Sequence, residues 1–152
     1  YFTVWSALGV VIFPLGVLLA DAELRLPALA RLVPVATGAV ILLAGAMQLT
    51  EWKARHLAWD RDAAARTRAM SGDSGTAWRH GLCLGVHCSY CCAGLTATYV
   101  ALGVMDLRVM AVVTAAIMAE RVAPAGARVA RAIGGVGIVA GMLLIARAVG
   151  SG

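Results

Sequence analysis

All four cysteines of the chain and two of its three histidines lie within residues 80–92. Thiolates and imidazoles are the ligands that soft and borderline transition metals prefer. The surrounding residues are mostly apolar, and polar side chains in an apolar membrane segment are costly unless they serve a function. The sequence therefore predicts metal chemistry in this segment, and its candidate ligands are His80, Cys83, His87, Cys88, Cys91 and Cys92.

The spacing of these residues predicts a stripe along one helix. At about 100° per residue, four of the six side chains fall on the same side of a helix, namely His80, Cys83, His87 and Cys91. Eleven helical residues extend roughly 16 Å, whereas metal–sulfur and metal–nitrogen bonds are only about 2.0–2.3 Å long. One ion cannot contact the whole stripe, so we expect either one compact site or a ladder of weak sites.

The densest part of the segment contains Cys88, Cys91 and Cys92, with His87 beside them. Thiolates select Cu(I), so copper is the predicted metal. Zn(II) is the alternative, although a tetrahedral zinc site would need helper ligands from elsewhere. The competing interpretation is structural, because cysteine also serves as a small packing residue in helices.

The elements that must position these residues are membrane helices. The 152-residue chain is 61% hydrophobic and 14% charged, against roughly 25% charged for a soluble domain. A hydrocarbon core of ~30 Å requires about 20 apolar residues in a helix. We predict an all-α, polytopic transmembrane helix bundle that forms a single domain over residues 1–152. Its membrane-spanning helices number about five, at about residues 3–20, 33–54, 79–104, 107–122 and 127–149.

The distribution of basic residues predicts an orientation. Nine of the 13 lysines and arginines lie at 53–79 and 121–131. The positive-inside rule places these two connections in the cytoplasm and residue 152 outside. We expect a cytoplasmic loop at about residues 55–78, whose first part extends the second helix past the membrane surface and carries His56 as a surface residue. The net charge of +5 is explained by this excess facing anionic membrane lipid, so no nucleic acid partner is expected.

Three further residues carry open alternatives. Glu120 ends the fourth predicted helix and is either a metal ligand, a carboxylate that orients a histidine, or the partner of Arg121 in a solvated ion pair. Gly137 and Gly141 form a small-residue face, which predicts close helix packing either within the chain or against a partner protein. The chain begins with Tyr1 rather than Met, so we expect a further segment upstream.

No catalytic constellation is present in the sequence. It has no Ser/His/Asp set, nucleotide-binding loop, HExxH motif or pair of buried carboxylates, so we expect no enzymatic activity. Three classes of protein remain: a metal-handling protein, a purely structural helix-packing subunit of a membrane complex, and a membrane thiol redox protein. The last is disfavoured because a thiolate is unfavourable deep in an apolar span.

Several short motifs resemble a known family. They are Gln48-Leu-Thr-Glu-Trp-Lys53, His80-Gly81, Cys88-x-x-Cys91-Cys92 and Gly103-Val-Met-Asp-Leu107. Together, over roughly residues 37–124, they resemble a bacterial family of integral membrane proteins predicted to bind metal, some of which are labelled copper chaperone. The resemblance implies a multi-pass protein of the bacterial inner membrane that handles copper by chaperoning or delivery. We expect such a small bundle to be an accessory subunit of a larger membrane complex, such as a copper-dependent oxidase or monooxygenase.

Overall fold

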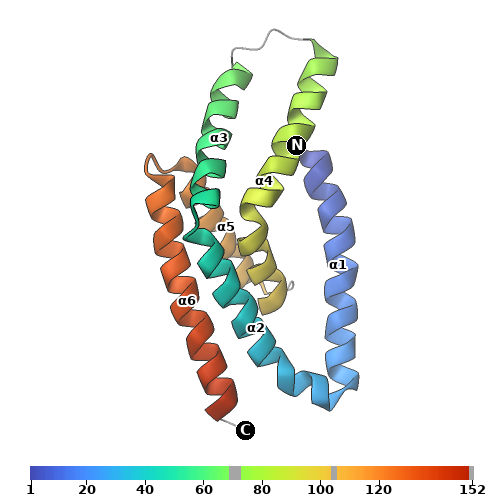
Figure 1. Ribbon diagram of the computed structural model, residues 1–152. Helices are drawn as coiled ribbons and strands as arrows, with labels where there is room; N and C mark the ends of the chain where they lie inside the picture. The colour runs from blue at the N-terminus through green and yellow to red at the C-terminus, as the bar shows by residue number, and fades with distance from the viewer. Residues whose placement is uncertain (69–72, 104–105, 151–152) are drawn as a thin grey trace.

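The computed structural model describes residues 1–68, 73–103 and 106–150, and this part of the chain contains six α-helices. Helices α1 and α2 form a hairpin at one end of the molecule, while α3 and α4 rise together at the other end (Figure 1). The predicted all-α class is confirmed. In chain order the helices are α1 (Phe2–Arg25), α2 (Pro27–Gln48), α3 (Glu51–Arg68), α4 (Ser74–Leu102), α5 (Leu107–Val122) and α6 (Gly126–Gly150).

Several helix ends follow local signals in the sequence. Leu26 is extended between α1 and α2, because the proline at position 27 disfavours a helical conformation in the residue before it. Helix α4 ends at Gly103, whose φ of 117° is one that side-chain-bearing residues rarely adopt. Asp106 caps α5 by accepting a hydrogen bond from the Arg108 backbone N–H at 2.8 Å. These signals explain why the predicted helix at 107–122 matches α5.

The second predicted helix, which was expected to continue past the membrane surface, is instead divided into α2 and α3. The prediction of one continuous helix is therefore wrong. The Thr50 hydroxyl donates to the Met47 carbonyl at 2.7 Å and accepts from the Lys53 N–H at 3.3 Å. A threonine that bonds to nearby backbone groups competes with helical hydrogen bonding, which explains the break between α2 and α3. The predicted loop at 55–78 is largely helical, although its residues 69–72 lie outside the described part of the chain.

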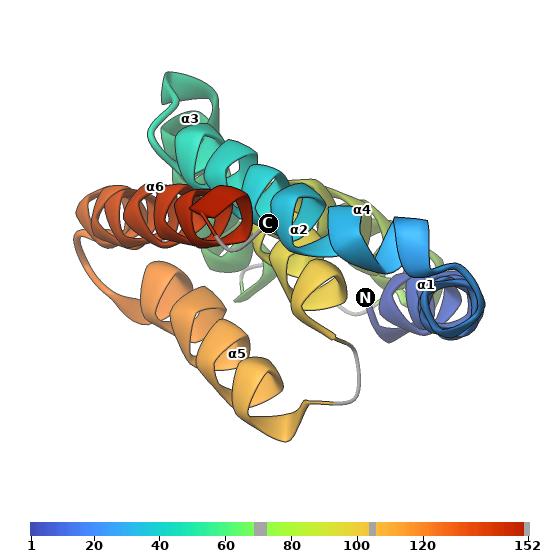
Figure 2. The ribbon, with the colours of Figure 1, turned by 90° about the horizontal axis from the view of Figure 1, so that it is seen from below.

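Three of the described helices, not five, are long and apolar enough to cross a membrane: α1, the Arg31–Gln48 part of α2, and α6. Helix α5 has 16 residues, fewer than the ~20 that a span requires. Figure 2 looks along α1 and shows α5 from the side, so α5 is steeply inclined to α1. Helix α4 is long enough, but Arg79 and its two histidines make it more polar than the three candidate spans. The predicted count of five spans was therefore too high.

The closest helix packing joins α2 to α6. A Cβ on Gly141 would lie 2.7 Å from the Gly38 carbonyl oxygen, and one on Gly134 would lie 2.7 Å from the Gly45 oxygen. Small residues allow backbones to approach in this way. Gly137 makes a looser contact, with its virtual Cβ 3.4 Å from the Gly45 Cα. Of the two alternatives for the glycine face of α6, the structure therefore shows packing within the chain.

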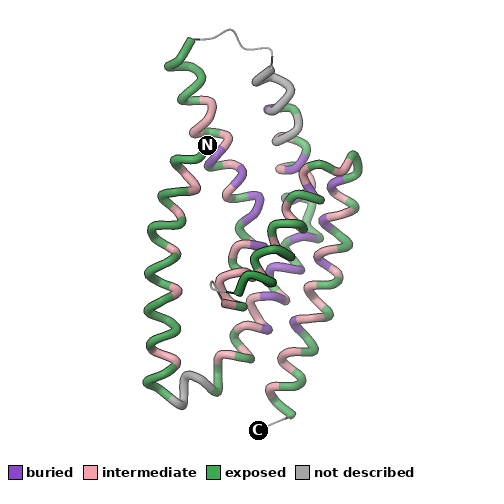
Figure 3. Tube along the Cα trace, turned by 180° about the vertical axis from the view of Figure 1, so that it is seen from behind, coloured by how far each residue is buried: buried purple, intermediate pink, exposed green. Residues whose placement is uncertain are grey.

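Helix α1 lies at the edge of the bundle and has no buried residue. Figure 3 shows the buried positions on the inner helices, whereas α1 is exposed or partly exposed along its length. An apolar helix with this exposure is suited to contact with lipid. The buried core lies instead where α3, α4 and α6 meet, and includes Leu57, Cys91 and Ala130.

Candidate functional site

Three of the four thiols are buried on one side of α4. Cys88, Cys91 and Cys92 are 1%, 3% and 1% exposed, and Leu95 continues the same face one turn later. This spacing of i, i+3, i+4 and i+7 is the pattern of a core-facing helix side. On this face Cys91 packs with Leu57 of α3 and Ala130 of α6.

The predicted stripe of four residues does not lie on this buried face as a unit. Cys83 is exposed, and His80 and His87 are half-buried. Of the stripe, only Cys91 is buried. The compact alternative, centred on the three buried thiols, fits the structure better than a continuous ladder of equivalent ligands.

The buried thiols interact with one another. The Cys92 thiol interacts electrostatically with the thiols of Cys88 and Cys91, and all four cysteines are free rather than in disulfides. The Tyr1 hydroxyl lies 3.3 Å from the Cys88 sulfur, and Arg121 donates to the Tyr1 oxygen at 3.3 Å. Tyr1 thus links the thiol cluster to the end of α5.

A preformed cage for a metal ion is absent from the part of the chain that the structure describes, because no three His, Cys, Asp or Glu side chains there are grouped so as to hold an ion. The three thiols nevertheless lie buried on one face of α4, with Cys92 interacting with the other two. Soft thiolate ligands are those that Cu(I) prefers, so the donor set fits copper.

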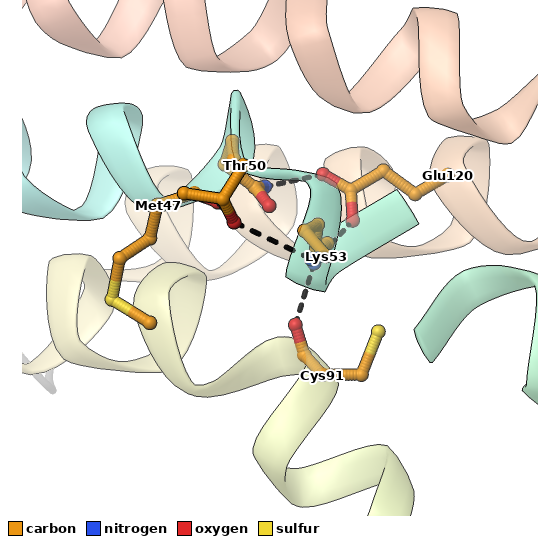
Figure 4. A network of polar contacts seen from close by, with 6 residues as sticks. Met47, Thr50, Lys53, Cys91 and Glu120 are labelled. Carbon is orange, nitrogen blue, oxygen red and sulfur yellow. Dashed lines mark hydrogen bonds and ion pairs between the residues drawn. The ribbon is translucent and has the colours of Figure 1, made fainter. Parts of the chain in front are cut away.

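A buried ion pair lies next to the thiols (Figure 4). The Lys53 Nζ is 2.9 Å from Glu120 Oε2, and the two side chains are 4% and 1% exposed. Lys53 also donates to the Cys91 carbonyl oxygen at 2.5 Å, and the Gln48 side-chain amide donates to Glu120 Oε1. This network connects α3 and α5 to the thiol-bearing turn of α4, with Gln48 at the end of α2 as a fourth contributor.

The location of Glu120 resolves part of the prediction made for it. Its partner is Lys53, deep in the bundle, and not the neighbouring Arg121 at a solvated interface. Both carboxylate oxygens are engaged, one by Lys53 and one by Gln48. Glu120 therefore acts in this conformation as a structural anchor beside the thiols.

Lys53 is the residue that sequence reasoning missed. At the end of an apolar run, a lysine is usually read as an interfacial residue with its charge in water. Its spacing from Leu57, which is also buried, places both on the inner face of α3. This i, i+4 spacing, together with the presence of Glu120 in another apolar run, is the sequence signal that could have indicated a buried ion pair.

His87, which directly precedes Cys88, belongs to a stack of aromatic rings. Its ring centroid is 4.5 Å from that of His56 and 3.9 Å from that of Trp59. Trp52 covers His56 from the other side, with the centroids 3.9 Å apart. His56 is therefore not an isolated surface histidine, because the α2–α3 break brings its ring against α4.

These features define a class of protein: a helical membrane protein with a buried cluster of soft metal ligands. A family model described as PpoB2, copper chaperone, matches residues 1–144. The chain therefore belongs to this copper chaperone family, and the family resemblance predicted from the motifs is confirmed. No curated protein and no solved structure matches the chain.

Proposed function

We propose that this protein is a copper chaperone of the bacterial inner membrane that carries Cu(I) on Cys88, Cys91 and Cys92, with His87 assisting. The observation that carries the proposal is the burial of three thiols together on one face of α4. Thiolates favour Cu(I) over harder cations. Cys83 and His80 lie nearer the start of α4, and Cys83 is exposed, so both are outside the compact site.

A carrier must release its cargo as well as bind it, and the site is suited to this. The Lys53–Glu120 pair holds the backbone of Cys91 rather than its sulfur. The backbone of Cys91 is thereby fixed by a contact that leaves its sulfur available as a ligand. Membership in a copper chaperone family supports the same function.

The experiment is to purify the protein from copper-supplied cells and measure bound copper and zinc for each chain. Cys88→Ser, Cys91→Ser and Cys92→Ser combined should remove most of the copper. Cys83→Ser is the matched control, because it removes a thiol that is exposed. Equal copper contents in the wild type and the triple variant would contradict the proposal. A wild type that carries zinc instead of copper would show that zinc is the bound metal.

We further propose that the chain acts as an accessory subunit of a larger membrane complex, such as a copper-dependent oxidase or monooxygenase. The bundle is small, and the described helices supply only three candidate spans. Since the glycine face of α6 is covered by α2, a partner would use other exposed apolar surfaces. Purification in mild detergent through a tag on this chain should recover a larger partner in fixed ratio. A single, monodisperse copper-binding protein would instead support a free-standing chaperone.

A further inference from the structure

A cavity of about 740 Å³ lies between α1, α2 and α4. Near its start α1 approaches α4 closely, since a Cβ on Gly85 would lie 3.0 Å from a side-chain carbon of Val4. From there α1 runs away from α4 and joins α2 at the hairpin, and the cavity lies between the three helices (Figure 1). Its volume is within the range of about 300–1,000 Å³ that is typical of sites for small molecules.

The cavity is a long groove with apolar walls. Its lining residues on α1 extend from Val4 to Leu19, which is roughly 22 Å of helix. On α4 its floor consists of small residues one helical turn apart, namely Ser89, Ala93, Ala97 and Ala101. Leu15 and Leu19 in its walls are exposed, so the groove is open at the side of a helix that is suited to contact with lipid. An occupant must therefore be narrow, elongated and apolar.

One polar group in the wall of this groove has no partner. The Nε1–H of Trp5 is buried and finds no hydrogen-bond acceptor in the described part of the chain. The indole nitrogen is only a donor, and a donor left unsatisfied in apolar surroundings is unfavourable. The occupant that fits the groove therefore carries a hydrogen-bond acceptor at one end of its apolar part.

Trp5 lies at the end of the groove that carries positive charge. Arg121 donates to the hydroxyl of Tyr1, one helical turn before Trp5. Arg79 is exposed two residues before Gly81, where an added Cβ would lie 3.4 Å from the Tyr1 nitrogen. Tryptophan is enriched at the depth where lipid headgroups meet the acyl chains. We expect this end in the cytoplasmic leaflet, which contains anionic lipids.

We propose that the groove binds one acyl chain of an anionic phospholipid, whose ester carbonyl accepts the Trp5 Nε1–H and whose phosphate lies near Arg79 and Arg121. An acyl chain is narrow enough for a floor of small residues. The ester group supplies acceptors without donors, at the junction of the chain and the headgroup. A transmembrane helix of a partner fits less well, because its backbone carbonyls are already bonded within the helix.

The first test uses the full chain, freed of lipid and kept in detergent, with a phosphatidylglycerol that carries bromine atoms on one acyl chain as the probe. Bromine quenches tryptophan fluorescence at contact distance. A background of Trp52→Phe, Trp59→Phe and Trp78→Phe leaves Trp5 as the only tryptophan. Quenching should saturate at a single bound lipid for each chain, whereas unspecific partition into the micelle rises without saturation.

Two variants on the helices of the groove form a matched pair in the same background. Ala97→Leu places a larger side chain on the floor and should abolish the saturable quenching. Ala7→Leu makes the same change at an exposed position of α1 outside the lining, and it should leave the quenching intact. Quenching of the wild-type groove without saturation, or equal saturable quenching in the two variants, would overturn the lipid site.

The hydrogen bond and the headgroup are tested by native mass spectrometry with unbrominated lipid. Trp5→Phe keeps an aromatic ring but removes the donor, and it should weaken phosphatidylglycerol binding by about 2- to 10-fold, the effect of one hydrogen bond. Phosphatidylcholine with the same acyl chains should bind more weakly than phosphatidylglycerol. Equal affinities of Trp5→Phe and the wild type would overturn the assigned carbonyl contact, even where Ala97→Leu fails to fold.

The remaining outcomes separate this site from the other proposals. Ala97→Leu should keep its copper, because the groove lies outside the thiol cluster, so loss of the lipid and loss of copper are independent results. If Ala97→Leu binds lipid normally but recovers less of a larger partner in mild detergent, the lipid site fails and the groove belongs to a helix of that partner.

Discussion

Lys53 and Glu120 form an ion pair with both side chains buried, and the Lys53 Nζ is 2.9 Å from Glu120 Oε2. The same ammonium group donates to the carbonyl oxygen of Cys91. The pair therefore connects the start of α3, the end of α5 and the thiol-bearing turn of α4 (Figure 4). Two charges in an apolar bundle are favourable only when each is compensated by the other and by further hydrogen bonds.

The first prediction concerns the loss of one member of this pair. Glu120→Gln leaves the Lys53 charge buried without its carboxylate, and it should lower the free energy of unfolding by about 3–5 kcal/mol. Lys53→Met combined with Glu120→Leu removes both charges and should recover much of that loss. Reversible unfolding in mixed micelles measures both. A cost for Glu120→Gln below about 1 kcal/mol, as is usual for exposed pairs, would show that the pair is not buried in solution.

The second prediction concerns the contact between α2 and α6. Gly141→Ala places a methyl group 2.7 Å from the Gly38 carbonyl oxygen, so the two helices must move apart. Overpacking of this kind should lower stability by about 1–3 kcal/mol. Gly135→Ala is the matched control on the same helix, because its methyl group meets nothing within 4 Å. Equal unfolding midpoints for the two variants would contradict the close backbone contact.

The third prediction is a pH dependence at the start of α4. Asp73 accepts hydrogen bonds from the Thr76 backbone N–H at 3.0 Å and from the Thr76 hydroxyl at 2.9 Å. The backbone bond first, and the hydroxyl second, hold the pKa of Asp73 below its usual value. The capping contribution is therefore fully present above the unfolded pKa of about 3.9, and it is lost as the pH falls through the lower folded-state pKa.

Amide hydrogen exchange in the first turn of α4, followed from neutral to acidic pH, measures this effect. The wild type should lose protection at acidic pH, whereas Asp73→Asn should show no such titration, because Asn caps helices without ionising. Parallel pH profiles for the two proteins would refute the assignment of Asp73 as the titrating cap.

The fourth prediction concerns orientation in the membrane. The α3–α4 end and the C-terminal end of α6 lie at opposite ends of the bundle (Figure 1). We expect the α3–α4 end in the cytoplasm, because the 53–79 and 121–131 connections carry most of the basic residues. Ser74→Cys and Val149→Cys, each in a Cys83→Ser background, place a thiol at exposed positions near the two ends. A membrane-impermeant reagent applied to intact cells should label position 149 but not position 74, and the reverse pattern would invert the orientation.

The helical class and the copper chaperone family could both be predicted from the sequence. These properties depend on composition and on residues close together in the chain. Helix ends with a local cause were also predictable, as at Asp106, where a side chain bonds to an amide two residues away. The number of spans was overestimated because long uncharged runs were counted as crossings, and α4 and α5 do not meet that requirement.

What only the tertiary structure decided is which distant residues meet. The Thr50 break turns α3 so that Lys53 reaches Glu120 and His56 stacks on His87. The glycines of α6 similarly proved to pack on α2, with Gly134 and Gly141 as the close contacts. Hydrophobic periodicity fixes which side of one helix is buried, but it carries no information on which helix covers that side. Pairing across helices depends on loop geometry and shape complementarity, which exist only once the whole chain has folded.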